Sequence, residues 1–158
     1  MKKGLILGRF QPLHMGHLSL FETVIDDGHE LLICIGSSNE ERTNNNPYTS
    51  LERTRMIRSV LSNYNCKYDI FEIPDINNND LYVKHLESIV PEFELVYSGN
   101  KLVKMLFENA GYSVIIPDLI KREAWQGASI RQAMKDGGDW EMDVPLSVAN
   151  IISEIELS

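Results

Sequence analysis

Short apolar runs alternate with helix-like patterns along the chain. The runs at residues 5–7, 31–36, 68–73, 95–97 and 112–116 predict β-strands, since each is short and rich in apolar residues. Between them, apolar residues recur at helical spacing over residues 18–27, 49–61, 81–89 and 101–109. Strands that alternate with helices pair in parallel through right-handed crossovers. We therefore predict a doubly wound, Rossmann-like α/β fold, with a parallel sheet of about five strands and helices on both faces.

The C-terminal part of the chain is expected to be helical from about residue 128. A short helix is predicted over residues 129–135, and another from Pro145, whose buried side carries Val148, Ile151, Ile152 and Ile155. The pattern contains neither an internal repeat nor a dividing linker, so residues 1–158 are predicted to be one domain. Residues 37–48 form the longest segment without a regular pattern, and long loops often take part in function.

The composition narrows the class of protein. The formal net charge is -8, whereas proteins that grip nucleic acid usually carry a basic surface. No apolar stretch reaches membrane-spanning length, and neither a membrane segment nor a signal peptide is expected. Cys34 and Cys66 lie far apart and indicate free thiols in a reducing compartment. We therefore expect a cytoplasmic protein whose main ligand is a small molecule rather than a nucleic acid.

Residues 8–17, Gly-Arg-Phe-Gln-Pro-Leu-His-Met-Gly-His, stand where the first predicted strand passes into the first helix. Ligands bind at that place in an α/β sheet, and a helix N-terminus offers free N–H groups and a positive dipole end to phosphate. His14 and His17 are three positions apart, so both imidazoles can point the same way and donate to phosphate oxygens. Gly16 leaves room for a phosphate to approach the backbone.

A plainer interpretation is that one histidine caps the helix and the other packs against it. Phosphate binding is favoured because it explains the histidines, the glycines and Arg9 together. A metal site is not predicted, since His14 and His17 have no Cys, Asp or Glu beside them at ligand spacing.

The ten-residue segment resembles the signature of the nucleotidyltransferase superfamily that carries a His-x-Gly-His motif. Further segments resemble the archaeal-type nicotinamide mononucleotide adenylyltransferases and follow the same order over nearly the whole chain. They are residues 35–38, 46–49 with 52–53, 96–100 and 138–140.

This resemblance implies transfer of AMP from ATP to nicotinamide mononucleotide (NMN), which gives NAD⁺ and pyrophosphate, with Mg²⁺ bridging phosphate oxygens. It implies that His14, His17 and Arg131 are catalytic, and that positioning and electrostatic stabilisation replace a protein nucleophile. It further implies that ATP lies against residues at two helix starts: Gly8, Arg9, Phe10, Gly16, His17, Ser129, Ile130 and Arg131. Members of the family commonly form homo-oligomers, which is the expectation here.

Residues 126–131, Gln-Gly-Ala-Ser-Ile-Arg, correspond to a second phosphate-binding segment of the family, which usually reads Ser-x-Thr-x-x-Arg. Arg131 matches that pattern, whereas Gln126 and Ala128 replace the hydroxyl residues, and Ser129 is a candidate to supply one hydroxyl. A purely structural alternative is that Ser129 and Gln132 form a capping box for the short helix.

The Asn-rich segment from Asp75 to Tyr82 is the candidate acceptor site. It does not fit a calcium loop, because Asp80 and Leu86 stand where that loop needs Gly and Glu. A plain Asx-rich turn that caps the next helix is one interpretation. The resemblance implies contacts with the nicotinamide nucleotide from Ser37, Ser38, Asp75, Ile76, Asn79, Tyr82 and Arg122, with Tyr82 where relatives often have tryptophan.

Several alternatives stay open at this point. Enzymes of the superfamily also act on pantetheine phosphate, flavin mononucleotide or glycerol phosphate, and a non-catalytic nucleotide sensor or a structural protein is a further alternative. In the loop at residues 37–48, some relatives carry a basic residue where Asn45 stands. Arg42 is a candidate to replace it, or the loop is a polar lid without chemistry.

Overall fold

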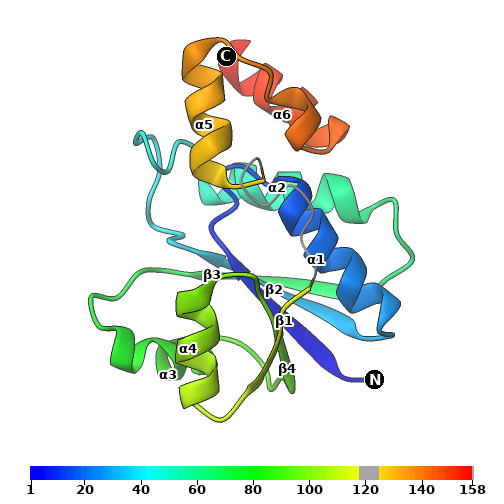
Figure 1. The fold of residues 1–158 in the computed structure, drawn as a ribbon, viewed down its shortest axis with the longest axis vertical. Helices are drawn as coiled ribbons and strands as arrows, with labels where there is room; N and C mark the ends of the chain where they lie inside the picture. The colour runs from blue at the N-terminus through cyan, green and yellow to red at the C-terminus, as the bar shows by residue number, and fades with distance from the viewer. Residues whose placement is uncertain (118–124, 158) are drawn as a thin grey trace.

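The five predicted strands are present and form one parallel sheet (Figure 1). The structure is a computed structural model that describes residues 1–117 and 125–157. The sheet order is β3-β2-β1-β4-β5. The strands are β1 (Lys3–Gly8), β2 (Glu30–Gly36), β3 (Tyr68–Ile73), β4 (Leu95–Tyr97) and β5 (Ser113–Ile115).

Helices cover both faces of this sheet, so the predicted doubly wound fold is confirmed (Figure 1). Successive side chains of a strand face opposite sides: Ile33 packs with one buried cluster, and Leu32 and Cys34 pack with the other. The first cluster joins the sheet to α1 (Met15–Asp26), α2 (Ser50–Leu61) and α6 (Leu146–Leu157). The second joins it to α3 (Tyr82–Glu87) and α4 (Lys101–Asn109).

The strand order reverses direction beside β1. The chain adds β2 and β3 on one side of β1 and then crosses to add β4 and β5 on the other side. Crossovers therefore leave β1 and β4 toward opposite faces, and this switch point is where open α/β sheets generally bind their ligands. The segment with His14 and His17 follows β1 and therefore starts at this switch point.

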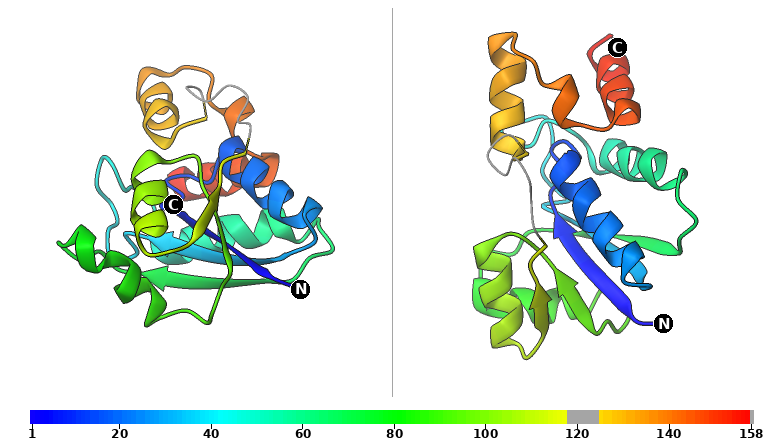
Figure 2. Two further views of the ribbon diagram at one scale, coloured as in Figure 1. Left: turned by 60° about the horizontal axis from the view of Figure 1, so that its bottom comes forward. Right: turned by 45° about the vertical axis from the view of Figure 1, so that its right-hand side comes forward.

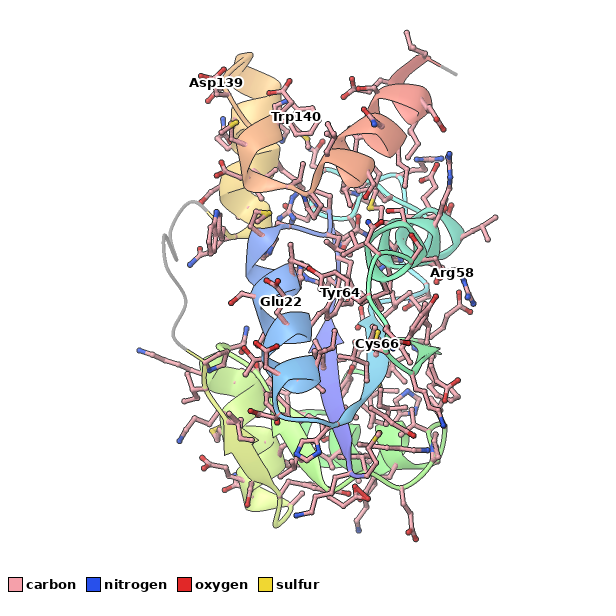
Figure 3. The ribbon with its side chains drawn as sticks, turned by 90° about the vertical axis from the view of Figure 1, so that its right-hand side faces the viewer. Glu22, Arg58, Tyr64, Cys66, Asp139 and Trp140 are labelled. Carbon is pink, nitrogen blue, oxygen red and sulfur yellow. The ribbon has the colours of Figure 1, made fainter. Side chains whose placement is uncertain are left out.

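The C-terminal helices lie over the same end of the sheet. In Figure 1 and in the right-hand view of Figure 2, α5 (Gly127–Asp136) and α6 stand above the carboxyl end of β1, opposite the N-terminus. The short 3-10 helix η2 (Glu141–Asp143) connects them, next to the half-buried Trp140 (Figure 3). The second segment predicted to bind phosphate, at the start of α5, thereby lies next to the first, since Arg131 Nη1 donates to Gln11 O.

Some predicted element boundaries are wrong. The helix expected over residues 81–89 begins as a 3-10 turn, η1 (Asn79–Leu81), and α3 ends at Glu87. The helix expected from Ser129 begins at Gly127, so Ser129 lies inside its first turn and cannot be its N-cap. The Ser129–Gln132 capping box is therefore wrong, and the Gln132 amide donates to Asp136 instead.

The capping box predicted for α2 is confirmed. Thr49 Oγ1 accepts from Glu52 N at 3.1 Å, and Glu52 Oε1 accepts from Thr49 N at 2.9 Å. Cys34 and Cys66 are free thiols, and burial raises the pKa of Cys34 to about 12. Among the described residues, no helix has the length and apolar character needed to cross a membrane.

Candidate active site

The turn that follows β1 is rigidly held. Phe10 is 1% exposed and has a φ of 54°, a left-handed conformation that residues with a side chain rarely adopt. The next side chain, Gln11, is also buried and bonds both backbone groups of Tyr48: its Nε2 donates to Tyr48 O at 3.0 Å, and Tyr48 N donates to its Oε1 at 2.9 Å. The turn is therefore fixed to the end of the long loop, just before α2.

His14 and His17 cap α1 with their Nδ1 atoms. Gly16 N donates to His14 Nδ1 at 3.1 Å, and His14 N donates to His17 Nδ1 at 3.1 Å. An Nδ1 atom that accepts from an amide carries no proton, so each neutral ring carries its proton on Nε2. The interpretation that one histidine caps the helix is thus confirmed for His14, whereas His17 also takes part in the cap rather than only packing against it. These bonds leave Nε2–H as the donor of each ring.

Both imidazoles are held neutral. Burial, with a smaller effect from Arg131, lowers the pKa of His14 to about 4. Burial, with a smaller effect from His14, lowers the pKa of His17 well below its usual range. The two rings stack with their centroids 3.8 Å apart, and His17 also lies 4.4 Å from the Phe10 ring. They therefore offer hydrogen-bond donors at neutral pH rather than positive charge.

Two glycines of the motif keep space beside these rings. A Cβ on Gly8 would lie 3.2 Å from His17 Nε2, and a Cβ on Gly16 would lie 2.8 Å from His14 Cε1. A methyl group at either position would crowd a histidine ring. Gly8 therefore leaves the space next to His17 Nε2 free of a side chain at the end of β1.

Arg131 reaches this turn from α5, as predicted. Its side chain is buried, and Nη1 donates to Gln11 O at 2.8 Å, across 120 residues of sequence. Burial, followed by repulsion from Arg9, lowers the pKa of Arg131, but a guanidinium remains charged at neutral pH. The exposed Arg9 is thus close enough to act on Arg131 electrostatically. Two neutral donors and two positive charges meet at one end of the sheet.

The first turn of α5 has free backbone N–H groups at its start. No side chain caps it, and its N-cap residue, Gln126, is exposed together with Ala128 and Ser129. The Ile130 side chain is 1% exposed and its N–H donates to Gln126 O, so it anchors the helix and offers no group to a ligand. The predicted contact between Ile130 and ATP therefore finds no support in its surroundings.

The predicted acceptor residues gather at the carboxyl ends of β2 and β3. Ser37 Oγ donates to Asp75 Oδ1 at 2.9 Å, and Asp75 N donates to Asn39 Oδ1 at 2.9 Å. A Cβ on Gly36 would lie 3.9 Å from the Tyr82 hydroxyl, so that hydroxyl lies near the end of β2. Burial, followed by the charge of Asp75, raises the pKa of Tyr82 to about 12.

The other described residues that were predicted to contact the acceptor lie in the loops after β2 and β3 and on η1. Ser38 N donates to Ile73 O at 3.2 Å, which joins the ends of β2 and β3. Asn79 is exposed on η1 and Ile76 is half-buried in the preceding loop. The Asx-turn interpretation is also correct, because Asn78 Oδ1 accepts from Asp80 N at 2.9 Å. Arg122 lies outside the described residues.

Arg53, on α2, belongs to the family-like segment at residues 52–53 but was not predicted to be a site residue, although it is 0% exposed. It donates to six backbone carbonyl oxygens around the ends of β1 and β2. One signal was available in the sequence: Arg53 precedes Met56, Ile57 and Val60 by three, four and seven positions, so it lies on the apolar stripe of the helix.

Comparison with known proteins agrees with this geometry. Residues 5–133 match the model of the cytidylyltransferase-like family. The nicotinamide-nucleotide adenylyltransferase of Picrophilus torridus is 42% identical over 98% of this chain and 92% of its own length. That of Pyrococcus furiosus is also 42% identical, over 98% of this chain and 85% of its own. The chain belongs to the nicotinamide-nucleotide adenylyltransferase family.

A solved structure supports the fold of this adenylyltransferase family member. The bifunctional NMN adenylyltransferase/ADP ribose pyrophosphatase from Francisella tularensis superposes with a TM-score of 0.75 at 20% identity, over 91% of this chain and 45% of that one. At that level of identity, the similarity concerns the fold alone.

The long loop of this adenylyltransferase family member holds its arginine in an ion pair. Arg42 bonds both carboxylate oxygens of Glu52 at 2.9 Å, and its Nη1 also donates to Pro47 O. Asn45 is exposed. Some relatives have a basic residue where this chain has Asn45. For Arg42 to make that contact instead, it would have to leave Glu52, and this role stays a prediction.

The donor set does not fit a metal held by the protein. Within residues 1–117 and 125–157, no three His, Cys, Asp or Glu side chains converge as metal ligands. The groups around β1 are imidazole N–H and guanidinium, which bind anions. A divalent cation at this adenylyltransferase site is therefore expected to arrive on the phosphates of ATP.

Proposed function

We propose that this protein transfers AMP from ATP to NMN and releases NAD⁺ and pyrophosphate. The observation that carries the proposal is the convergence of His14, His17 and Arg131 on the turn after β1, within a family whose relatives carry that enzyme name. A phosphate oxygen of NMN attacks the α-phosphorus of ATP, and the bond from that phosphorus to the bridging oxygen of the β-phosphate breaks. The electron pair leaves with pyrophosphate.

The side chains act by position and charge in this scheme. His14 and His17 donate Nε2–H bonds to ATP phosphate oxygens as neutral imidazoles. Arg131 and Arg9 supply positive charge next to the negative charge that develops on the leaving pyrophosphate. The uncapped first turn of α5 adds backbone N–H donors, which compensates for the hydroxyls absent at Gln126 and Ala128.

The acceptor binds over the ends of β2 and β3. Asp75, held by Ser37 and Asn39, faces the amide of the nicotinamide, and the Tyr82 ring stacks on the pyridine. Mg²⁺ enters with ATP as part of the substrate, where it neutralises phosphate charge.

The test is a panel of acceptors incubated with ATP and Mg²⁺, scored by pyrophosphate release and by the mass of the product. We expect NAD⁺ from NMN, with at least about tenfold lower kcat/KM for pantetheine phosphate, flavin mononucleotide and glycerol phosphate. Faster turnover of another acceptor would move the protein to a different branch of the family. Binding of ATP without turnover of any acceptor would indicate a sensor.

A further inference from the structure

Arg53 is a buried positive charge whose contacts are backbone carbonyls. Among the described residues it is the largest fully buried side chain, and no carboxylate there forms an ion pair with it. A buried charge is costly unless its donors are bonded, so such an arginine needs partners for all five N–H groups. Burial lowers its pKa, yet a guanidinium stays protonated at neutral pH.

The carbonyl oxygens around Arg53 outnumber the N–H protons of its guanidinium. Nε donates to Thr49 O at 3.2 Å, and Nη1 donates to Arg9 O and Gly36 O, each at 3.1 Å. Nη2 contacts three further oxygens, those of Ser37, Ser38 and Glu40, at 3.3, 3.4 and 3.1 Å. Five protons serve six oxygens, so one is shared, and the planar guanidinium is fixed in every direction.

These oxygens belong to both halves of the candidate site. Arg9 directly follows β1 and starts the turn that leads to the histidines, whereas Gly36 ends β2 and Ser37 starts the acceptor side. The residues after the two Nη1 acceptors, Phe10 and Ser37, have φ values of 54° and 49°. Left-handed backbone at residues with a side chain persists only where the surroundings enforce it.

We propose that Arg53 is a positioning residue that holds the ATP-binding turn after β1 and the acceptor-binding loop after β2 in a fixed relation. It touches neither substrate. By bonding Arg9 O and the carbonyls of Gly36 and Ser37 with one rigid fork, it sets the separation between the α-phosphorus and the attacking phosphate. This inference rests on the proposed function, because it assigns Arg53 to the alignment step of that transfer.

The test compares Arg53→Lys and Arg53→Gln with Arg58→Met. Arg58 lies on the same helix but is exposed and extends away from the sheet (Figure 3). Lysine keeps the charge and has only three protons on one atom, so it cannot hold six carbonyls. In both Arg53 variants we expect kcat to fall at least about 30-fold, while the Kd of ATP measured alone changes less than about threefold. Arg58→Met should keep wild-type values.

A folded Arg53→Lys variant with kcat within about threefold of wild type would overturn the proposal, as would an equal loss in kcat and in ATP affinity. If neither Arg53 variant folds, arginine-labelled NMR spectra of the wild-type protein provide the test. Comparison with the spectrum of Arg131→Met identifies the signals of the other guanidinium that is buried among the described residues. We expect one guanidinium with four separate Nη–H signals that shift when NMN and ATP bind, and signals that average or stay still would overturn the proposal.

The wild-type assay separates the two claims. No pyrophosphate release from ATP and NMN by the wild-type protein would remove the proposed function itself. An active wild-type protein with an equally active Arg53→Lys variant would remove only the positioning role.

Discussion

The starts of α1 and α5 meet at the same end of the sheet but are built in opposite ways. At α1, the two histidine side chains cap the helix, and both rings are packed and neutral. At α5, no side chain caps the first turn, and Ala128 and Ser129 are exposed. The first start thus offers side-chain donors in a fixed direction, and the second offers backbone donors with a charged arginine. The comparison shows that two helix N-termini at one end of a sheet can offer hydrogen-bond donors with or without side-chain caps.

The largest effect should come from removing the side-chain donor at α1. His17→Ala takes away an Nε2–H donor next to Gly8 and should lower kcat about 100- to 1000-fold, about 3–4 kcal/mol, while ATP binding weakens much less. His29→Gln, just before β2, is the control and should keep wild-type kcat. Steady-state kinetics with ATP titrations measure both, and an unchanged kcat in His17→Ala would refute the assigned role.

The neutral state of the α1 histidines should also make the free energy of unfolding depend on pH. The pKa of His14 is about 4 in the folded protein and about 6.5 when unfolded, so the unfolded chain binds more protons between these values. The contribution of neutral His14 to the free energy of unfolding is fully present above pH 6.5 and is lost as the pH falls toward 4. At pH 5 the loss should reach about 2 kcal/mol. Urea unfolding at pH 7.5 and pH 5 should show it, and His14→Gln should show a smaller difference between the two pH values.

A moderate effect is expected at α5. Arg131→Met removes the bond to Gln11 O and one positive charge, and should lower kcat/KM for ATP about 10- to 30-fold, or about 1.5–2 kcal/mol. Lys135→Met, in the last turn of the same helix, provides the matched control because Lys135 is exposed. Equal kinetics for the two variants would leave α5 with no role beyond its backbone.

The smallest effect tests how closely the arginine of α5 packs. A Cβ on Gly127 would lie 2.7 Å from Arg131 Nη1 and 3.4 Å from Gln11 O, so Gly127→Ala should displace the guanidinium. We expect kcat/KM for ATP to fall about fivefold, about 1 kcal/mol. Gly138→Ala, whose nearest neighbour would lie 3.5 Å away, should have no such effect. A loss in both variants would point to helix stability instead.

Much of the fold could be predicted because its signals are local. The apolar runs identified every strand, and the Thr49–Glu52 capping box gave the start of α2. The start of α5 was misplaced because Ser129 fits a local cap, whereas the bond between Arg131 and Gln11 holds the turn of α5 that begins at Gly127. That bond joins residues 120 positions apart, which a local pattern does not contain.

The sequence by itself determined the class of the fold, because apolar runs alternate with helical patterns along the chain. It also determined the histidine motif, because residues 8–17 contain it in full. Only the tertiary structure decided the chemical state of that motif, because burial and reciprocal backbone bonds keep both imidazoles neutral with Nε2–H as the donor. It also turned Arg53, a charged residue on an apolar stripe, into a link between the two strand ends. A charged side chain is stable in the interior when folding brings hydrogen-bond partners to it, and for Arg53 these partners are backbone carbonyl oxygens.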